Sequence, residues 1–411
     1  MKKYMKAAFA FLCVVGLAAM ISLGSHAETA VPYGLTKEPS MTDGKVTICW
    51  QYHAGNGTDN VSYQLEVALD EAFTKQTCVI DSETTSAVVS KDAFGENGGY
   101  IYMRVRALFT DAQGNVSYSD YSAVSKYTFV KINKKNFPGL YNVLKNWNCY
   151  EAQKRESVIT KGNKVSQKVV AVQYTKKSKN NKDGWLDPSE ISTIHKIGRK
   201  SYAFKNLSVP KYKIPSLEGI EFFSALKCLE IYGYQKENLT LWNPELEDLN
   251  MENFGKKLNI KAPHLTSIDL YDGSSKTNTS TREIRINAEN LTSLTISGNN
   301  TKLTLGKMKK LQELVLDAIK AEQKTLYLSR FENLKQVTLR FSDFTKIDAG
   351  SCKKLQELYC YQYKYLNSIN LKHCNKLEHV GSYSCPKLTD RKVSLPKGKK
   401  KACRINKGLW W

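Results

Sequence analysis

The C-terminal half of the chain repeats a short pattern of apolar positions. A unit of the form L-x-x-h-x-h, where h is apolar, recurs eight times, and its first leucines lie 19 to 26 residues apart. These leucines are Leu226, Leu246, Leu265, Leu291, Leu311, Leu334, Leu355 and Leu377. A repeat of this length predicts a solenoid in which each turn adds one short strand to a shared core.

Each repeat also contains a second alternating apolar pair. Examples are Leu239/Leu241, Leu258/Ile260, Ile284/Ile286, Leu303/Leu305, Leu326/Leu328 and Ile369/Leu371. The spacing from this pair to the next leucine is five or six residues, whereas the spacing from the first run to the pair varies from 7 to 14. We therefore expect one strict corner and one variable corner from which loops emerge.

The N-terminal part alternates with a period of two instead. Val46, Ile48 and Trp50 share one face of a predicted strand. The same alternation recurs in two further runs, Tyr63-Gln-Leu65-Glu-Val67 and Ile101-Tyr-Met103-Arg-Val105-Arg-Ala107. In the second of these runs the arginines are predicted to face outward. With the closing Ser119-Asp120-Tyr121-Ser122, the order of these strands resembles a fibronectin type III domain. Ile101 stands where that family usually has a tyrosine. The resemblance implies a β-sandwich over residues 28–131, with a spacer role as the simplest interpretation.

A connector over residues 132–213 contains two predicted helices. Asn136-Phe-Pro138 opens the first, which carries Leu140, Val143, Leu144 and Trp147 at helical spacing. Asp187-Pro188-Ser189-Glu190 is a capping sequence for the second, in which Ile191, Ile194 and Ile197 form one face before Gly198 ends it. The lysine-rich stretch from Lys161 to Lys182 between them is predicted to be solvated.

The residues before the second helix resemble an EF-hand loop. Gly184 falls at the sharp turn, and Asn181, Asp183 and Glu190 are candidate calcium ligands. Lys179 occupies the first ligand position, where a cation repels Ca²⁺. We expect a degenerate loop that caps the helix, with calcium binding as the alternative.

The first 27 residues have the pattern of an export signal. Three lysines precede an apolar core from Ala7 to Leu23, and Ser25-His26-Ala27 is a small-x-small cleavage site. No later stretch is apolar over the roughly 18 residues that a transmembrane helix needs. The expected protein is secreted or extracellular, with association to the cell wall as a further option, which excludes an integral membrane protein and a cytosolic enzyme.

Charge divides the chain near residue 131. Residues 28–130 carry 7 Lys and Arg against 13 Asp and Glu, whereas residues 131–411 carry 51 against 26. A basic tail over residues 396–411 contains a candidate polyanion-contact cluster of Lys397, Lys399, Lys400, Lys401 and Arg404. Anionic wall polymers or glycosaminoglycans are its candidate partners, and a tail that only aids solubility is the alternative. Nucleic acid is not expected, because no binding module accompanies the charge.

Nothing in the sequence predicts catalysis, a metal or a cofactor. The five histidines after the signal lie outside any nucleophile-elbow, HExxH or phosphate-loop context; they are His53, His195, His264, His373 and His379. Nine cysteines after the signal, none with CxxC spacing, predict mostly buried thiols, Cys352 and Cys374 being stacked in successive turns. The alternative is one or two disulfides, of which Cys385–Cys403 fits best.

The repeats resemble the leucine-rich repeat domains of secreted bacterial proteins. Ile214-Pro-Ser-Leu217-Glu-Gly219-Ile220-Glu-Phe222 resembles the family's entry segment, and Cys360 matches its cysteine-bearing repeat variant. The resemblance implies an extracellular recognition solenoid over residues 214–395, of Gram-positive type. The expected fold is thus β-rich and multidomain: a fibronectin type III-like β-sandwich, then a leucine-rich repeat solenoid with a small helical N-terminal cap.

Strand alternation places a ligand surface on the first strands. The outward pairs are Glu230/Tyr232, Asn250/Glu252, Asp269/Tyr271, Thr295/Ser297, Val315/Asp317, Thr338/Arg340, Tyr359/Tyr361 and Gly381/Tyr383. Tyr359, Tyr361, Tyr363 and Tyr365 alternate and are predicted to present rings on one side, unless some pack against a cap of Leu409, Trp410 and Trp411. The candidate ligand-binding residues are Tyr232, Tyr271, Arg340, Tyr359, Tyr361, Tyr363 and Tyr383.

The function expected from these features is non-catalytic recognition or adhesion, with an extracellular protein or glycan as ligand. The alternative is a structural wall-associated protein that positive charge holds on anionic wall polymers.

Overall fold

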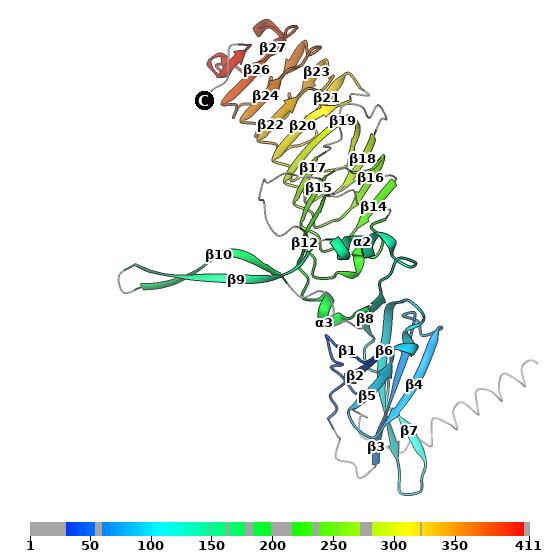
Figure 1. Ribbon diagram of the computed structural model, residues 1–411. Helices are drawn as coiled ribbons and strands as arrows, with labels where there is room; N and C mark the ends of the chain where they lie inside the picture. Colours follow the sequence, from blue (N-terminus) through cyan, green and yellow to red (C-terminus); the bar gives the residue numbers. More distant parts are fainter. Residues whose placement is uncertain are drawn as a thin grey trace, which may run out of the picture. The chain divides into compact units, whose positions relative to one another are not determined.

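The chain folds into two compact units, Met1–Val130 and Lys131–Trp411. The computed structural model describes residues 30–53, 60–146, 148–161, 164–176, 184–198, 216–232, 238–252, 254–271, 282–320 and 323–406 (Figure 1). The predicted signal and the candidate calcium ligands Asn181 and Asp183 lie outside these residues. No helix within the described ranges has the length and apolar character to cross a membrane.

Two antiparallel sheets make up the N-terminal unit. One has the order β1-β2-β5, with β1 Met41–Thr42, β2 Lys45–Cys49 and β5 Ser86–Ser90. The other has the order β8-β6-β3-β4, with β7 also paired to β6; its strands are β3 Asn60–Ala68, β4 Gln76–Ser82, β6 Gly98–Thr110, β7 Val116–Tyr118 and β8 Ser125–Lys131. The predicted alternation is confirmed, because Val46, Ile48, Leu65 and Val105 are fully buried.

The exposed face of β6 carries an organised polar cluster. The Arg104 Nε donates to Glu66 Oε2 at 2.8 Å, and its guanidinium carbon lies 3.8 Å from the Tyr121 ring centroid. Ser119 and Ser122 accept hydrogen bonds from the backbone N–H groups of Ala107 and Val105. The backbone N–H groups of the same two serines donate in return to the Ala107 and Val105 carbonyls, so side-chain and backbone hydrogen bonds together hold the closing segment against β6.

The second unit begins with α2 (Pro138–Asn146), where a helix was predicted. Leu140 and Val143 of α2 are buried. A Cβ atom added to Gly139 would lie 1.6 Å from the Ser216 carbonyl oxygen, so the helix and the segment entering the solenoid approach closely. Only glycine allows this approach.

The rest of the connector differs from the prediction. The lysine-rich stretch forms much of an antiparallel hairpin, β9 (Asn148–Lys161) with β10 (Lys164–Lys176). After β11 (Trp185–Leu186), α3 spans only Pro188–Ile191 and has the predicted capping box between Asp187 and Glu190. The predicted helix stops there because β12 (Lys196–Gly198) joins a sheet, pairing with both β9 and the first solenoid strand.

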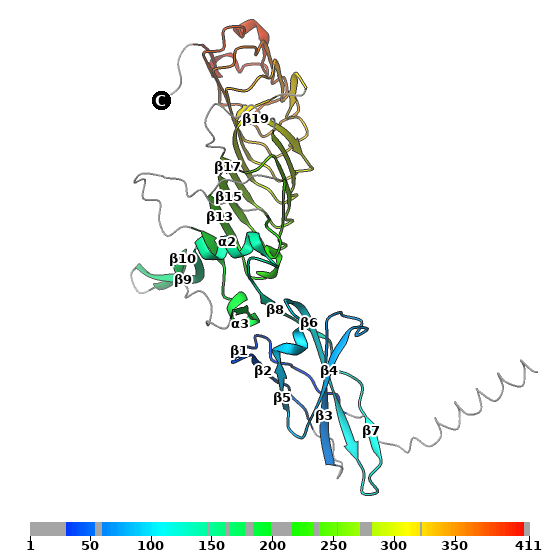
Figure 2. The same ribbon diagram turned by 45° about the vertical axis from the view of Figure 1, so that its right-hand side comes forward.

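The remainder of the unit is a β-solenoid whose first strands form a parallel sheet along one side (Figures 1 and 2). These strands are β13 Cys228–Tyr232, β15 Asp248–Glu252, β17 Ser267–Tyr271, β19 Ser293–Leu305, β20 Glu313–Ile319, β22 Gln336–Arg340, β24 Glu357–Tyr361, β26 His379–Tyr383 and β28 Cys403–Ile405. Their register aligns the repeats without a slip, pairing Leu229 with Leu249 and that residue with Ile268. The repeat prediction is confirmed.

Second strands form the other side in two parallel ladders, the first of which joins the first-strand sheet through β19. The first contains β14 Asn238–Trp242, β16 Lys257–Lys261, β18 Arg282–Asn287 and the end of β19. The second contains β21 Thr325–Tyr327, β23 Lys346–Asp348, β25 Ser368–Asn370 and β27 Val393–Ser394. The predicted second apolar pairs lie in these strands or at their ends.

The strict corner has a repeated hydrogen-bond pattern. The carbonyl that follows each first leucine accepts two N–H groups from the next turn; the Lys227 oxygen, for example, accepts from Glu247 and Asp248, both at 2.9 Å. The same pattern continues at Glu247, Thr266, Thr292, Gln312, Lys335 and Gln356. The near-constant spacing of five or six residues between each second apolar pair and the next leucine corresponds to this corner.

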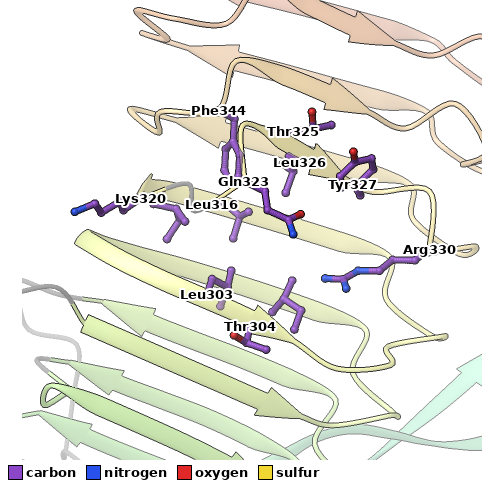
Figure 3. A pocket seen from close by; sticks show the side chains of 12 residues that line it. Leu303, Thr304, Leu316, Lys320, Gln323, Thr325, Leu326, Tyr327, Arg330 and Phe344 are labelled. Carbon is purple, nitrogen blue, oxygen red and sulfur yellow. The ribbon is translucent and has the colours of Figure 1, made fainter.

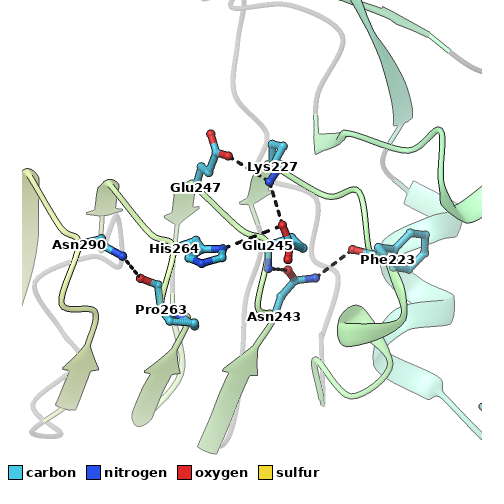
Figure 4. A network of polar contacts seen from close by, with 8 residues as sticks. All are labelled: Phe223, Lys227, Asn243, Glu245, Glu247, Pro263, His264 and Asn290. Carbon is cyan, nitrogen blue, oxygen red and sulfur yellow. Dashed lines mark hydrogen bonds and ion pairs between the residues drawn. The ribbon is translucent and has the colours of Figure 1, made fainter. Parts of the chain in front are cut away.

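Side chains reinforce the first of these corners (Figure 4). The buried Asn243 amide donates to the Phe223 and Ile220 carbonyls, at 3.2 and 2.9 Å, and so ties the entry segment to the solenoid. Lys227 Nζ lies 3.0 Å from Glu245 Oε2 and 3.1 Å from Glu247 Oε1. Asn290 makes an equivalent bond between turns two corners further, donating to the Pro263 carbonyl at 2.9 Å.

The cysteines from Cys49 to Cys403 are all free thiols, most of them buried in the solenoid. Cys352 and Cys374 take equivalent positions in successive turns, where each thiol donates to a backbone carbonyl of the preceding turn. Burial raises the pKa of Cys352 to about 12 and that of Cys374 to about 11.

We expect thiol reagents to distinguish these environments. Because the thiolate is the reactive form, the folded chain at pH 8 should react rapidly at exposed Cys49, slowly at half-buried Cys78 and Cys403, and negligibly at the six buried thiols. Peptide mapping after labelling measures each site. In denaturant without reductant all nine should react, whereas protection of Cys385 and Cys403 alone would contradict the free-thiol assignment.

Candidate functional site

The outward side chains of the first strands form two rows along the solenoid. Strand register confirms the predicted rows and their order. The first row is Glu230, Asn250, Asp269, Thr295, Val315, Thr338, Tyr359 and Gly381, and the second is Tyr232, Glu252, Tyr271, Ser297, Asp317, Arg340, Tyr361 and Tyr383. Neighbouring members of a row belong to strands about 4.8 Å apart, so the face presents a continuous surface.

The beginning of this face is mixed in character. Glu230 is almost fully buried and forms an ion pair with Lys196 Nζ at 2.5 Å, which removes it from the accessible surface. Tyr271 is exposed, as predicted. The side chain of Tyr232 lies outside the described part of the chain.

Carboxylates occupy the middle of the face. Burial raises the pKa of Asp269, and the nearby Asp248 carboxylate raises it further. Burial also raises the pKa of Asp317, although the charge of Arg340 on the neighbouring strand opposes that shift. A partly desolvated carboxylate next to an arginine gives this region polar contacts of both signs.

Aromatic rings and an arginine gather towards the C-terminal end. The rings of Tyr359 and Tyr361 lie 6.5 Å apart between centroids, and the Arg340 guanidinium carbon lies 5.4 Å from the Tyr361 centroid. Tyr383 pairs with Tyr361 in register and is 51% exposed. We call Arg340, Phe341, Tyr359, Tyr361 and Tyr383 the aromatic end.

Phe341 belongs to a column of unusual backbone positions that the sequence analysis missed. The residues directly after Asp317, Arg340, Tyr361 and Tyr383 all have φ between 50° and 56°; they are Ala318, Phe341, Gln362 and Ser384. A residue with a side chain costs about 1–2 kcal/mol in this left-handed conformation. Phe341 is 58% exposed, so an aromatic ring stands on the surface at a strained backbone position.

Tyr363 does not belong to the face, and its prediction as a ligand-binding residue is wrong. Extended alternation would carry Tyr363 to the same side as Tyr361, but the left-handed Gln362 turns the chain between them. The Tyr363 side chain is fully buried, and burial raises the pKa of its hydroxyl well above the usual value. Tyr365 is exposed beyond this turn.

The basic segment is folded, which corrects its prediction as a tail. A 3₁₀ turn spans Lys400–Ala402, and β28 pairs with β26 so that Arg404 lies beside Gly381. Arg404 therefore continues the first row by one more strand. Lys397, Lys400 and Lys401 are exposed, whereas Lys399 is half-buried. The proposed cap residues Leu409, Trp410 and Trp411 lie outside the described residues.

Within the described ranges, no three His, Cys, Asp or Glu side chains come together as a metal site would require. Glu190, one of the candidate calcium ligands, instead completes the capping box of α3, where its Oε2 accepts from the Asp187 N–H at 3.4 Å.

No protein-family model and no curated protein matches the sequence. Among solved structures, an internalin from Listeria monocytogenes is similar over 49% of this chain and 64% of its own, with 15% identity and a TM-score of 0.26. A second similar structure is pectate lyase Pel3 from Pectobacterium carotovorum, with 8% identity and a TM-score of 0.15, over 82% of this chain and 86% of its own. This chain thus spans less than two thirds of that internalin.

Substitution should separate the buried tyrosine from the exposed ones. Because its ring is enclosed, Tyr363→Ala should lower the free energy of unfolding by about 3–5 kcal/mol. Tyr383→Ala should change it by about 0.5 kcal/mol or less. Urea titration followed by far-ultraviolet circular dichroism measures both. Equal effects of the two substitutions would contradict the assignment of Tyr363 to the core.

Proposed function

We propose that this is a secreted or cell-surface recognition or adhesion protein that binds a protein or glycan through the outward face of its solenoid. The aromatic end is the observation that carries the proposal. Binding requires no chemistry at this face, and we propose no catalytic role for the chain.

Energetics favour a binding role for the aromatic end. Tyr383 and Phe341 expose about half or more of their surface, which costs free energy in water and is typical of a surface that a partner covers. Tyrosine and arginine are the residue types that dominate binding hot spots. The arginine above Tyr361 also provides hydrogen-bond donors, which orient a carboxylate or a sugar hydroxyl beside the rings.

The N-terminal unit fits a supporting role in this proposal. Its two sheets have the orders β1-β2-β5 and β4-β3-β6-β8, with β7 also paired to β6, an arrangement that supports the resemblance to a fibronectin type III domain. We propose that it is a spacer for the solenoid, with α2 and α3 in the role of a helical cap. The signal-like N-terminus and the repeat pattern support export, and Gram-positive type remains part of the proposal.

Charge offers a different basis for surface attachment. Lys397, Lys400 and Lys401 are exposed near Arg404, and the unit from residue 131 onward carries a large excess of positive charge. These residues would hold the chain on anionic wall polymers without recognising a particular ligand. Such binding depends steeply on ionic strength, because salt screens exposed charges.

Binding to bacterial cell walls and to a panel of glycans and extracellular proteins distinguishes the two proposals. The purified chain should bind one ligand saturably, and binding should persist at about 0.5 M salt, where the screening length is near 4 Å. The double substitution Tyr361→Ala/Tyr383→Ala should weaken it at least about tenfold. Tyr118→Ala, which removes an equally exposed tyrosine of the N-terminal unit, is the matched control and should bind normally.

The opposite result supports the charge-based alternative. Wall binding that disappears in salt and is indifferent to the tyrosines, but falls with Lys397→Ala/Lys400→Ala/Lys401→Ala, would replace specific recognition by attachment through charge.

A further inference from the structure

The second-strand side of the solenoid is interrupted at one place. The parallel ladder of β14, β16 and β18 ends at the last part of β19. Within the described residues, the next ladder on this side starts with β21 and β23. The first-strand sheet, by contrast, continues from β19 to β20 and β22. Within the described part of the chain, no strand pairing therefore joins the end of β19 to β21 on this side of the core.

The exposed fractions of the inward side chains differ at this place. The equivalent residues in neighbouring turns, such as Leu258, Ile284 and Ile347, are at most 1% exposed. Leu303 and Leu326, which border the interruption, are each partly exposed instead. Apolar groups that other turns cover with a paired strand thus remain accessible here.

A pocket of about 280 Å³ occupies the interruption (Figure 3). It is lined by Leu303, Thr304, Leu305, Leu316, Ile319, Lys320, Gln323, Thr325, Leu326, Tyr327, Arg330 and Phe344. The leucines lie in the middle, the Arg330 side chain reaches towards them from one end, and Lys320 lies at the opposite end (Figure 3).

The polar lining has a single sign of charge. Among the described residues that line the pocket, two of twelve are cations and none is Asp or Glu. Arg330 is exposed at one end of the pocket, and the partial burial of its guanidinium lowers its pKa. A guanidinium has five N–H donors in a planar fork, a geometry that matches the two oxygens of a carboxylate.

We propose that this pocket binds a small amphipathic carboxylate. Its aliphatic part would contact Leu303 and Leu326, and its carboxylate would accept hydrogen bonds from Arg330. The small volume favours a compact ligand, since pockets for drug-sized molecules span about 300–1,000 Å³. The two cations, with no carboxylate among the described lining residues, favour an anion over an amine or a neutral alcohol. This site is independent of the aromatic end, which lies on the other side of the solenoid.

Calorimetric titration of the full chain with octanoate, octan-1-ol and octylamine tests the charge requirement. Octanoate should bind with one-to-one stoichiometry, and the alcohol and amine should bind at least about tenfold more weakly. Arg330→Gln should remove this preference for octanoate. The exposed Arg391→Gln is the matched control and should behave as the unsubstituted chain.

A second variant tests the location without depending on Arg330. Gln323 is exposed and its side chain points among the pocket leucines (Figure 3), so Gln323→Trp should fill the space and abolish octanoate binding while the melting temperature is retained. Equal binding of octanoate and octan-1-ol, or octanoate binding that survives Gln323→Trp, would overturn the proposal. So would self-association that Gln323→Trp removes in sedimentation, with no octanoate bound, because the occupant would then be a second copy of the chain.

Discussion

The corner carbonyl that accepts two N–H groups from the next turn is the interaction on which the solenoid depends. It fixes the axial position of each turn against the one before, as Lys227 does for Glu247 and Asp248. Together with the buried leucine at the same corner, it leaves no freedom for a one-residue slip. Such a slip would exchange the core and solvent faces of every following strand.

The composition of the outward face follows from this register. Because each turn repeats the same inward positions, the outward positions are free to vary, and they change from acidic to aromatic along the rows. The same constraint explains the pocket. β19 and β20 continue the first sheet while the second sheet is interrupted, so the solenoid keeps its register and opens its core on one side only.

Periodic features were predictable from the sequence, and local departures from the period were not. The leucine spacing predicted the strands, the strict corner and both outward rows. It could not predict Tyr363, because alternation assumes an extended chain and Gln362 is left-handed. Ile197 joined a sheet in place of the predicted helix because Leu229 and Cys149 offered partners distant in the sequence. The sequence predicts a basic tail at Cys403 to Ile405, because these residues do not match the leucine repeat although they pair with β26.

Blocking one face of the solenoid tests the central claim most directly. In a Cys49→Ser background, Thr338→Cys on β22 and the control Lys346→Cys on β23 each place one new thiol, on opposite sides of the solenoid. Both would be labelled with a bulky maleimide and applied to the glycan and extracellular-protein panel. The account predicts that the label at residue 338 abolishes ligand capture and that the label at residue 346 leaves it unchanged. Undiminished capture with residue 338 labelled would contradict it.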